Sequence, residues 1–288
     1  MITRRMRSQK MQDSASSMGK NLLMVILSVV FLFPIYALFL ASFRPGRDLL
    51  RWGITMATLV PKGLNILNYT SLVTGKDGIY FLWFRNSLLL LAFQTALCLF
   101  FSSFVGYGLG AYRFKGRNTV SAFVIFLMMV PIQILILPLY KLMIVTRLMN
   151  TYPGVFLPFI VSPFAIFFFR QYVIGIPKDF IDAGRIDGLT EYSIFFRIIA
   201  PLMTPAYGAM AIFTAMASWN NFLWPLIVLR TGNMFTLPIG LNSLLSPYGN
   251  NYDILITGAA TATIPIIIIF IFFQRYFIAG MTSGGVKG

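Results

Sequence analysis

Long apolar runs alternate with short polar segments along almost the whole chain. A membrane-spanning helix needs about 20 mainly apolar residues, and six segments reach or approach this length. They are residues 21–43, 87–112, 119–140, 153–169, 205–229 and 254–273. The pattern therefore predicts an all-α membrane protein with six transmembrane helices. The fourth segment is short and contains Pro158 and Pro163, so a re-entrant element is the alternative there.

The six apolar segments contain no Asp, Glu, Lys, Arg or His. Ionisable groups inside a membrane typically serve proton relays, ion sites or voltage sensors. Their absence argues against a proton-coupled transporter and a voltage-gated channel. Two other classes stay open, a sodium-driven secondary transporter that uses carbonyls and hydroxyls, and an anchoring protein without a solute pathway. If the chain supports uphill transport, the energy is expected to enter through a partner.

Composition narrows the function further. The chain is 58% hydrophobic and 11% charged, against about 25% charged residues in soluble domains. Its net charge of +15 comes from residues scattered through the connecting segments, without the basic stripe that nucleic acid requires. The sequence has no His, a single Cys98 and no phosphate-loop motif. We therefore expect no catalytic residue, no disulfide within the chain, and no metal or other cofactor bound by it.

The distribution of Lys and Arg predicts the orientation. With six helices both ends of the chain share a side, and that side carries 14 basic residues against 9 on the other. The positive-inside rule then places both termini in the cytoplasm, although Arg44, Arg47 and Arg51 oppose it. The first apolar run exceeds the length of a signal-peptide core and has no convincing cleavage site, so we expect a retained helix.

This topology divides the chain into four parts. We expect a cytoplasmic N-terminal tail at residues 1–20, the first helix with an external loop at 21–79, a transmembrane domain at 80–275, and a cytoplasmic tail at 276–288. The domain includes a long cytoplasmic connection at 170–204. The outer connections 44–86 and 230–253 are polar, which is typical of surface loops.

Some uncharged polar residues lie within the apolar runs. They are Gln133, Trp219, Asn220, Asn221 and Trp224. One interpretation is a solute pathway, in which amides bond hydroxyl groups and aromatic faces stack on sugar rings. The alternative is hydrogen bonding between helices, with tryptophans at the interface.

The glycines Gly106, Gly108 and Gly110 indicate a close contact between helices, and a hinge is the alternative.

The connection 170–204 has strong helix-boundary signals. Pro177 suits a helix start, Asp179 complements the helix dipole, and Gly188 suits the helix end. Thr190 can cap a second helix that runs toward Pro201.

On the first of these helices four residues fall on one face, with Asp182 and Arg185 beside it. They are Phe180, Ala183, Gly184 and Gly188. Such a face admits another protein to close backbone contact, and the alternative is a helix that rests on its own chain.

The same segment resembles the E-A-A-x3-G-x9-I-x-L-P signature of binding-protein-dependent ABC importer permeases. Asp182-Ala183-Gly184, Gly188, Ile198 and Pro201 occupy its positions, with Asp for Glu, Gly for the second Ala, and Ala200 for Leu. Residues 218–226 (S-W-N-N-F-L-W-P-L), 236–241 (T-L-P-I-G-L) and the ending F-Q-R-Y-F-I-A-G-M-T-S-G-G-V-K-G resemble the smaller permease subunit of the maltose-type carbohydrate branch. The resemblance covers residues 80–288.

This resemblance implies a type I importer permease, with a MetI-like core of five helices plus one N-terminal helix, in the cytoplasmic (inner) membrane. The expected partners are a second permease, two copies of an ATPase that binds ATP and Mg, an extracytoplasmic solute-binding protein, the bilayer and a sugar. A sugar-phosphate such as glycerol-3-phosphate is the alternative substrate.

The resemblance also assigns a coupling helix that seats in the ATPase. Its residues are Phe180, Asp182, Ala183, Gly184, Arg185, Asp187 and Gly188, supported by Ile198 and Pro201. We expect Gly188→Asp to impair docking or coupling.

Overall fold

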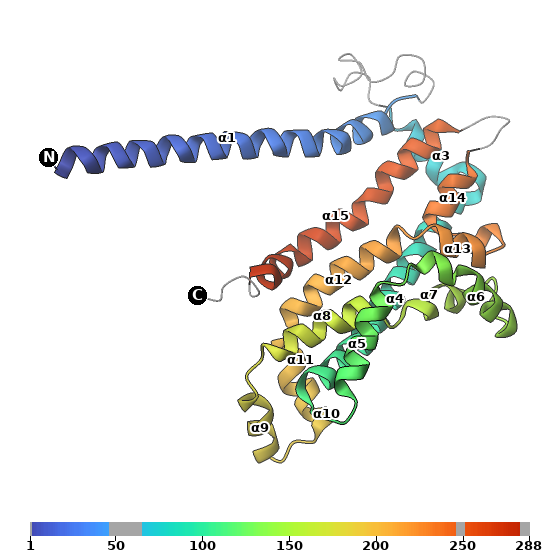
Figure 1. Ribbon diagram of the computed structural model, residues 1–288. Coiled ribbons are helices and arrows are strands. Elements are labelled where there is room, and N and C mark those ends of the chain that lie inside the picture. The colour runs from blue at the N-terminus through green and yellow to red at the C-terminus, as the bar shows by residue number, and fades with distance from the viewer. Residues whose placement is uncertain (1, 46–64, 246–250, 283–288) are drawn as a thin grey trace. The chain divides into compact units, whose positions relative to one another are not determined.

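The computed structural model describes residues 2–45, 65–245 and 251–282, and all regular structure in these ranges is helical (Figure 1). The chain forms two compact units. Unit 1 contains Met1–Gly75 and Leu244–Thr261, and unit 2 contains Lys76–Ser243 and Ala262–Gly288. The predicted all-α fold is confirmed.

Unit 1 contains α1 (Ile2–Ser42), α3 (Leu67–Thr74) and the first part of α15 (Tyr252–Thr282). The amide of Asn68 donates to the carbonyls of Ser42, at 3.0 Å, and of Arg44, at 2.7 Å. The hydroxyl of Thr257 also donates to the carbonyl of Ser42, at 3.2 Å. These bonds occupy carbonyls that the end of α1 leaves without partners in the helix.

Helix α1 begins well before the first apolar run. The segment predicted as an N-terminal tail, residues 1–20, is helical from Ile2 onward. This segment has no proline and is rich in Arg, Lys, Gln and Met, which favour helix. Part of the predicted external loop, residues 46–64, lies outside the described residues, as do 246–250 and 283–288 of the predicted outer connection and C-terminal tail.

Unit 2 holds the remaining helices, and its boundary with unit 1 falls in the 3-10 turn η1 (Gly75–Gly78). In chain order they are α4 (Ile79–Ala111), α5 (Arg117–Met128), α6 (Ile132–Val145), α7 (Tyr152–Phe156), η2 (Leu157–Phe159), α8 (Pro163–Ile174), α9 (Asp179–Ile186), α10 (Glu191–Ile194), the π-helical turn η3 (Phe195–Ile199), α11 (Ala200–Leu202), α12 (Thr204–Trp219), α13 (Leu223–Val228), η4 (Gly232–Met234), α14 (Leu237–Ser243) and the second part of α15.

Three helices are long and apolar enough to cross a membrane without interruption, namely Met18–Ser42, Ile79–Ala111 and Tyr252–Tyr276. Three further spans are bent pairs of shorter helices. The bends are 99° between α5 and α6, 43° between Tyr152–Phe159 and α8, and 77° between Glu191–Leu202 and α12. The predicted six spans are therefore present if each bent pair is counted as one.

Single continuous helices at 119–140 and 205–229 are not observed, and the segment 153–169 is also interrupted, which is compatible with the re-entrant alternative for it. The segment 119–140 breaks before α6, where Pro131 lacks an N–H and restricts the residue before it. The segment 153–169 breaks at Ser162, whose hydroxyl caps α8 directly before Pro163. The segment 205–229 stops at Trp219, because the missing N–H of Pro225 prevents a helix from continuing through Asn221.

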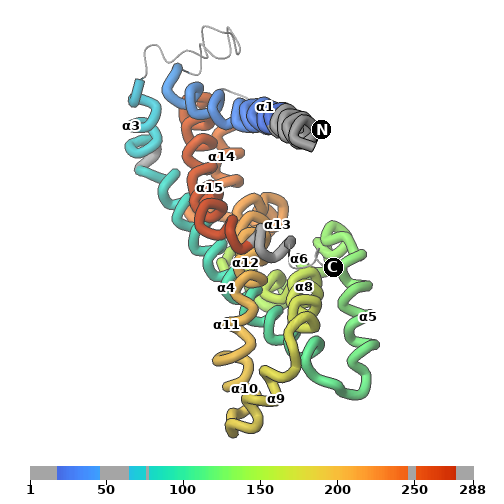
Figure 2. The backbone as a smooth tube through the Cα atoms, turned by 90° about the vertical axis from the view of Figure 1, so that its left-hand side faces the viewer, coloured from blue at the N-terminus to red at the C-terminus, as the bar shows by residue number. Residues whose placement is uncertain are grey.

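Close packing of α4 against α8 forms the centre of unit 2 (Figure 2). A Cβ atom on Gly106 would lie 2.7 Å from the Cβ of Phe169 and 2.9 Å from the backbone nitrogen of Arg170. A Cβ on Gly110 would lie 2.7 Å from a methyl group of Val173. The predicted packing role is thus confirmed for Gly106 and Gly110. It is wrong for Gly108, whose Cβ would meet nothing within 4 Å.

The segment after α13 is not the surface loop that its polarity predicts. The indole of Trp83 donates to the carbonyl of Gly232 at 2.8 Å, and the amide of Asn86 donates to the carbonyls of Asn233 and Phe235 at 2.9 and 3.0 Å. Residues 236, 237, 239 and 240 are buried. Likewise residues 79–86, predicted as loop, form the first turns of α4. The start of α4 therefore holds this connection by hydrogen bonds.

Candidate functional site

The short helix α9 projects at one end of unit 2, near the C-terminal end of α4 (Figure 1). Its end is a Schellman motif, in which the N–H of Leu189 bonds the carbonyl of Gly184 and the N–H of Gly188 bonds that of Arg185. Gly188 has φ +75°, a left-handed conformation that favours glycine. The predicted boundary at Gly188 is confirmed, and so is the cap by Thr190, whose hydroxyl accepts from the N–H of Ser193.

One side of α9 packs against its own chain. Ile181 and Gly184 are buried, and a Cβ on Gly184 would lie 2.8 Å from Ile198 and 3.0 Å from Ile194. The expectation that Gly184 belongs to an outward docking face is therefore wrong. A glycine is needed at position 184 because Ile194 and Ile198, in the helical segment after α9, pack directly against it.

The other side of α9 is exposed and apolar. Phe180 is 46% exposed, Ala183 is exposed, and Ile186 is 86% exposed. We call Phe180, Ala183 and Ile186 the outer face of α9. Asp182, Asp187 and Gly188 are also exposed. Sequence reasoning missed Ile186, although its spacing from Phe180 and Ala183 in steps of three residues could have revealed it.

Ionic and hydroxyl groups connect α9 to its neighbours. The guanidinium of Arg185 donates to Glu191 at 2.8 Å and to Asp182 at 3.1 Å. The hydroxyl of Tyr112, directly after α4, donates to the other carboxylate oxygen of Glu191 and lies 3.2 Å from the hydroxyl oxygen of Tyr107. This network links α9, α10 and the end of α4.

The remaining coupling residues lie on the helical segment after α9. Ile198 is half-buried in the π-helical turn, and Pro201 is exposed, with its carbonyl accepting from the hydroxyl of Thr204 at 2.6 Å. Ile194 and Ile199 are fully buried beside them. This segment packs against the buried side of α9 and does not extend its outer face.

The five residues considered for a solute pathway do not lie together on one surface. Trp219 and Trp224 are each 4% exposed, and their indoles donate to the carbonyls of Ala262, at 3.1 Å, and Gly154, at 3.2 Å. They pack inside the chain and have almost no surface to offer a solute.

The three amide side chains are more exposed than the two tryptophans. Gln133 and Asn220 are exposed, and Asn221 is half-buried. The amide nitrogen of Asn220 caps α12 by donating to the carbonyl of Met216 at 3.0 Å. The solute-contact hypothesis thus narrows to these amides.

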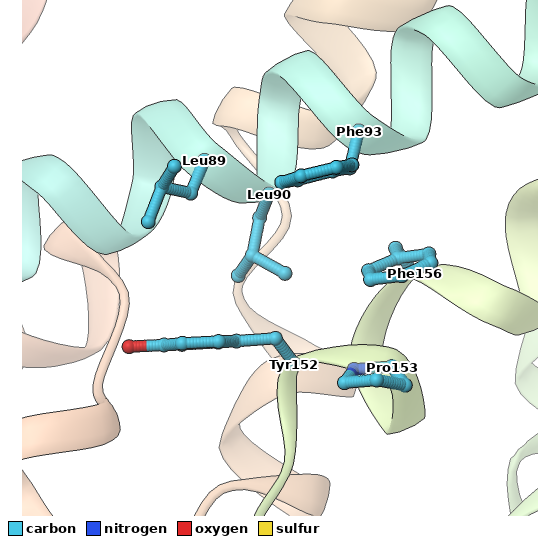
Figure 3. Close-up of a pocket in the computed structure, with 6 residues that line it drawn as sticks. All are labelled: Leu89, Leu90, Phe93, Tyr152, Pro153 and Phe156. Carbon is cyan, nitrogen blue, oxygen red and sulfur yellow. The ribbon is translucent and has the colours of Figure 1, made fainter.

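An apolar hollow of about 230 Å³ lies between α4 and α7 (Figure 3). Its lining residues are Leu89, Leu90, Phe93, Tyr152, Pro153 and Phe156. The rings of Phe93 and Phe156 are nearly parallel, with centroids 6.0 Å apart. The hydroxyl of Tyr152 points away from them and donates to Asn86 at 2.7 Å. The hollow offers aromatic faces and no polar side-chain group, so it does not match a sugar by itself.

Comparison with known families decides the class of the chain. Residues 102–283 match the family of binding-protein-dependent transport system inner membrane components. The chain belongs to this family. The matched residues include α9, the ion pair between Arg185 and Glu191, and the interruption between α12 and α13 at Asn220.

Several characterised permeases are similar to this one. The arabinooligosaccharides transport system permease protein AraQ of Bacillus subtilis is 57% identical, over 96% of this chain and 98% of the relative. The lactose transport system permease protein LacG of Rhizobium radiobacter is 40% identical, over 71% and 74%. The crystal structure of a bacterial ABC transporter that imports the acidic polysaccharide alginate has a chain with the same fold, with a TM-score of 0.78, 22% identity, and coverage of 92% of this permease and 98% of that chain.

The network in this permease shifts the pKa values of Glu191 and Tyr112. The Arg185 guanidinium, and then the Tyr112 hydroxyl, hold the pKa of Glu191 below its ordinary value of 4.5. Burial, followed by the bond to the Glu191 carboxylate, raises the pKa of Tyr112. Tyr112 therefore stays a neutral donor while Glu191 stays ionised.

The shift at Glu191 predicts a pH dependence for the attachment of α9. Because the folded-state pKa is lowered, this carboxylate stabilises the loop above about pH 4.5 and loses that contribution as the pH falls through the lowered value. Hydrogen exchange, corrected for intrinsic rates, should show the Leu189 amide losing protection in acid. Glu191→Gln should lower the protection at neutral pH and remove the acid step. Asp179→Asn is the control, because Asp179 has no ion pair among the described residues. This variant should still lose protection at Leu189 as the pH falls. If Glu191→Gln loses protection in acid as the wild type does, the assignment is contradicted.

Proposed function

We propose that this chain is one of two permeases in an ATP-driven importer for a sugar or oligosaccharide. The other components are a second permease, two copies of an ATPase, and an extracytoplasmic binding protein that delivers the solute. The observation that carries the proposal is the outer face of α9. An exposed face formed by Phe180, Ala183 and Ile186, on a helix placed by a Schellman motif and an ion pair, is typical of a contact with another protein.

In this proposal α9 seats in the ATPase, which binds ATP and Mg and hydrolyses the nucleotide. Closure of the two ATPases moves α9. Arg185 and Glu191 carry the displacement to α10, and Tyr112 carries it to the end of α4. Movement of α4 and the helices packed on it then alternates the pathway between inward and outward access.

The substrate class rests on the relatives and on the broken segment after α12. Relatives that share 57% and 55% identity are named as transporters of arabinooligosaccharides, which supports a short neutral oligosaccharide. Backbone outside helices is tolerated at membrane depth where it lines a water-filled cavity. The exposed Asn220, at the break between α12 and α13, fits a solute path because an amide both donates to and accepts from hydroxyl groups.

The orientation follows from the same proposal. Docking to a cytoplasmic ATPase puts α9 in the cytoplasm, and the excess of basic residues puts both termini there too. The start of α4 and the segment 231–237 then lie toward the outside of the cell.

The proposal is tested by purification and transport. A tagged copy, gently solubilised from native membranes, should co-purify with a second permease and an ATPase. The recovered complex in proteoliposomes, with its binding protein, should take up labelled arabinotriose only when ATP is enclosed, and should not take up glycerol-3-phosphate. Uptake driven by a sodium gradient without an ATPase would replace the proposal by a secondary transporter. Preference for glycerol-3-phosphate would leave the importer and change its substrate.

A further inference from the structure

The turn between α4 and α5 carries three basic residues within five positions. They are Arg113, Lys115 and Arg117. No Asp or Glu occurs from residue 79 to residue 178. The turn lies at the same end of unit 2 as α9 (Figures 1 and 2), where Tyr112, directly before it, bonds Glu191. Glu191 is already paired with Arg185, and both ion pairs among the described residues involve Arg185. Within the described part of the chain, no carboxylate therefore neutralises the turn.

An open hollow of about 310 Å³ lies in this turn. Its walls include Arg113, Gly116, Arg117, Asn118 and Thr119, and we call it the basic hollow. Arg113 is exposed.

Arg117 is fixed in the wall of the basic hollow. Its Nε donates to the carbonyl of Leu109 at 2.7 Å, and its Nη2 donates to that of Gly110 at 3.4 Å. These bonds satisfy carbonyls at the end of α4 and orient the guanidinium without cancelling its charge. A guanidinium is a planar fork that matches a phosphate group with two hydrogen bonds. The two arginines thus give the basic hollow the chemistry of a phosphate site.

The first turn of α5 reinforces this chemistry. Asn118 and Thr119 belong to it, at a position where backbone N–H groups lack partners within the helix and the helix dipole favours an anion. The N-cap Gly116 has φ +92°, and a Cβ there would meet nothing within 4 Å. The basic hollow is therefore open beside these N–H groups.

An exposed apolar strip on α5 begins next to the basic hollow. It consists of Val120, Phe123 and Phe126, of which the two phenylalanines are each 58% exposed. Their rings are stacked, with centroids 6.4 Å apart. Another side of α5 packs on the chain through Ser121 and Val124, which are buried. Because α5 is the first half of a bent membrane span, the strip has the surface that hydrocarbon contacts, and the charges lie at its edge.

We propose that the basic hollow and the apolar strip together bind one anionic phospholipid, an inference that rests on the proposed function for its cytoplasmic orientation. The phosphate lies between Arg113 and Arg117, and an acyl chain follows the strip. A soluble anion uses the hollow alone, and an apolar partner helix uses the strip alone. A phospholipid uses both, because its charge and its hydrocarbon are joined at the membrane surface. Basic pockets beside membrane helices on the cytoplasmic side attract such headgroups.

The test labels the detergent-purified importer complex with phosphatidylglycerol that carries a photoreactive group on one acyl chain. Mass spectrometry of the digested chain should find the label on α5. Arg113→Gln should raise the lipid concentration for half-maximal labelling of α5 about fivefold, the effect of one basic residue at an anionic headgroup. Labelling of Tyr252–Tyr276 on α15 should not change, which provides a reference within the same chain. Lys141→Gln, which removes an exposed basic residue on α6, is the matched control and should label α5 as wild type does.

Competition identifies the ligand. Unlabelled phosphatidylglycerol should displace the label from α5 at least about fivefold more effectively than phosphatidylcholine, whose headgroup has no net charge. Displacement should weaken in high salt, because attraction between exposed charges is screened. Inorganic phosphate at the concentration of the lipid should not displace the label, because it makes no contact with the strip.

Three results would overturn the proposal. The first is labelling of α5 that Arg113→Gln leaves unchanged, or that phosphatidylcholine prevents as well as phosphatidylglycerol does. The second is displacement by inorganic phosphate, which would assign the basic hollow to a soluble anion. The third is labelling of α5 only after the second permease is removed, which would assign the strip to a contact between proteins. If the tagged chain is recovered without an ATPase, the proposed function is wrong, and the label on α5 still decides the lipid site.

Discussion

Replacing Ile186 by Asp is expected to weaken association with the ATPase about tenfold to a hundredfold and to reduce ATP-driven uptake accordingly. Ile186 is the more exposed of the two large side chains on the outer face of α9. Burying an isoleucine contributes about 1.5–3 kcal/mol, and each 1.4 kcal/mol is tenfold in affinity. An aspartate would lose this contribution and add the cost of an unpaired charge in an interface. The measurements are the amount of ATPase that co-purifies and the initial rate of uptake.

The fold should not change in this variant, because Ile186 has almost no contact with its own chain. Phe114→Asp is the matched control, since Phe114 is 48% exposed in the connection between α4 and α5. It should retain the ATPase. A complex with Ile186→Asp that purifies intact and transports at the wild-type rate would refute the assignment of α9 to docking.

Substitution of Gly188 tests the same helix through its backbone. A Cβ at Gly188 would meet nothing within 4 Å, so no clash inside this chain opposes a side chain at that position. The cost instead comes from φ +75°, roughly 1–2 kcal/mol for an ordinary side chain. Gly188→Val should loosen the end of α9 more than Gly188→Asn, because asparagine tolerates this conformation better. Gly188→Asp adds a charge and should reduce docking more than Gly188→Asn.

Gly106→Leu is expected to produce a large loss of stability in unit 2. Its Cβ alone would lie 2.9 Å from the backbone nitrogen of Arg170 and 3.0 Å from the backbone oxygen of Ile166. Backbone cannot rotate away as a side chain can, so α4 and α8 must separate. Overpacking of a core costs typically 1–3 kcal/mol, and the rigid contact places this variant at the upper end. Thermal unfolding in detergent should shift downward by about 2–4 °C for each kcal/mol.

Gly108→Ala is the matched control, two residues away on the same helix. Its Cβ would meet nothing within 4 Å, so the gain in helix propensity should stabilise α4 by up to about 1 kcal/mol. Equal unfolding midpoints for Gly106→Leu and Gly108→Ala would contradict the packing of α4 on α8.

Much of the architecture could be predicted because a bilayer demands long apolar helices. The breaks at Pro131, Ser162 and Asn220 could not be located from hydropathy, because the apolar runs continue through them. The burial of residues 236, 237, 239 and 240 could not be predicted for another reason. It depends on Asn86 and Trp83, which lie about 150 residues earlier in the chain, and no local pattern encodes such a pairing.

The candidate site could likewise be predicted only in part from the sequence. The end of α9 at Gly188 and the cap at Thr190 follow from local backbone chemistry, and the sequence alone predicts them. Which side of α9 faces outward depends on where Ile194 and Ile198 pass. For that reason the sequence alone predicts the wrong side for Gly184. The hydrogen bonds from the N–H groups of Arg230 and Thr231 to the side chain of Asn150 likewise join segments that only the folded chain brings together.

Helix α4 is a single element of 33 residues without a proline, and this has a mechanical consequence. At 1.5 Å per residue it is about 50 Å long, against a hydrocarbon layer of about 30 Å. One end is bonded to the helix pair around Glu191, and the other to the segment at Asn233. If a rod of this length pivots about its middle by about 5°, each end moves by roughly 2 Å. Leverage along α4 can thus carry a push from one face of the membrane to the other in a single rigid movement, without a relay of small rearrangements.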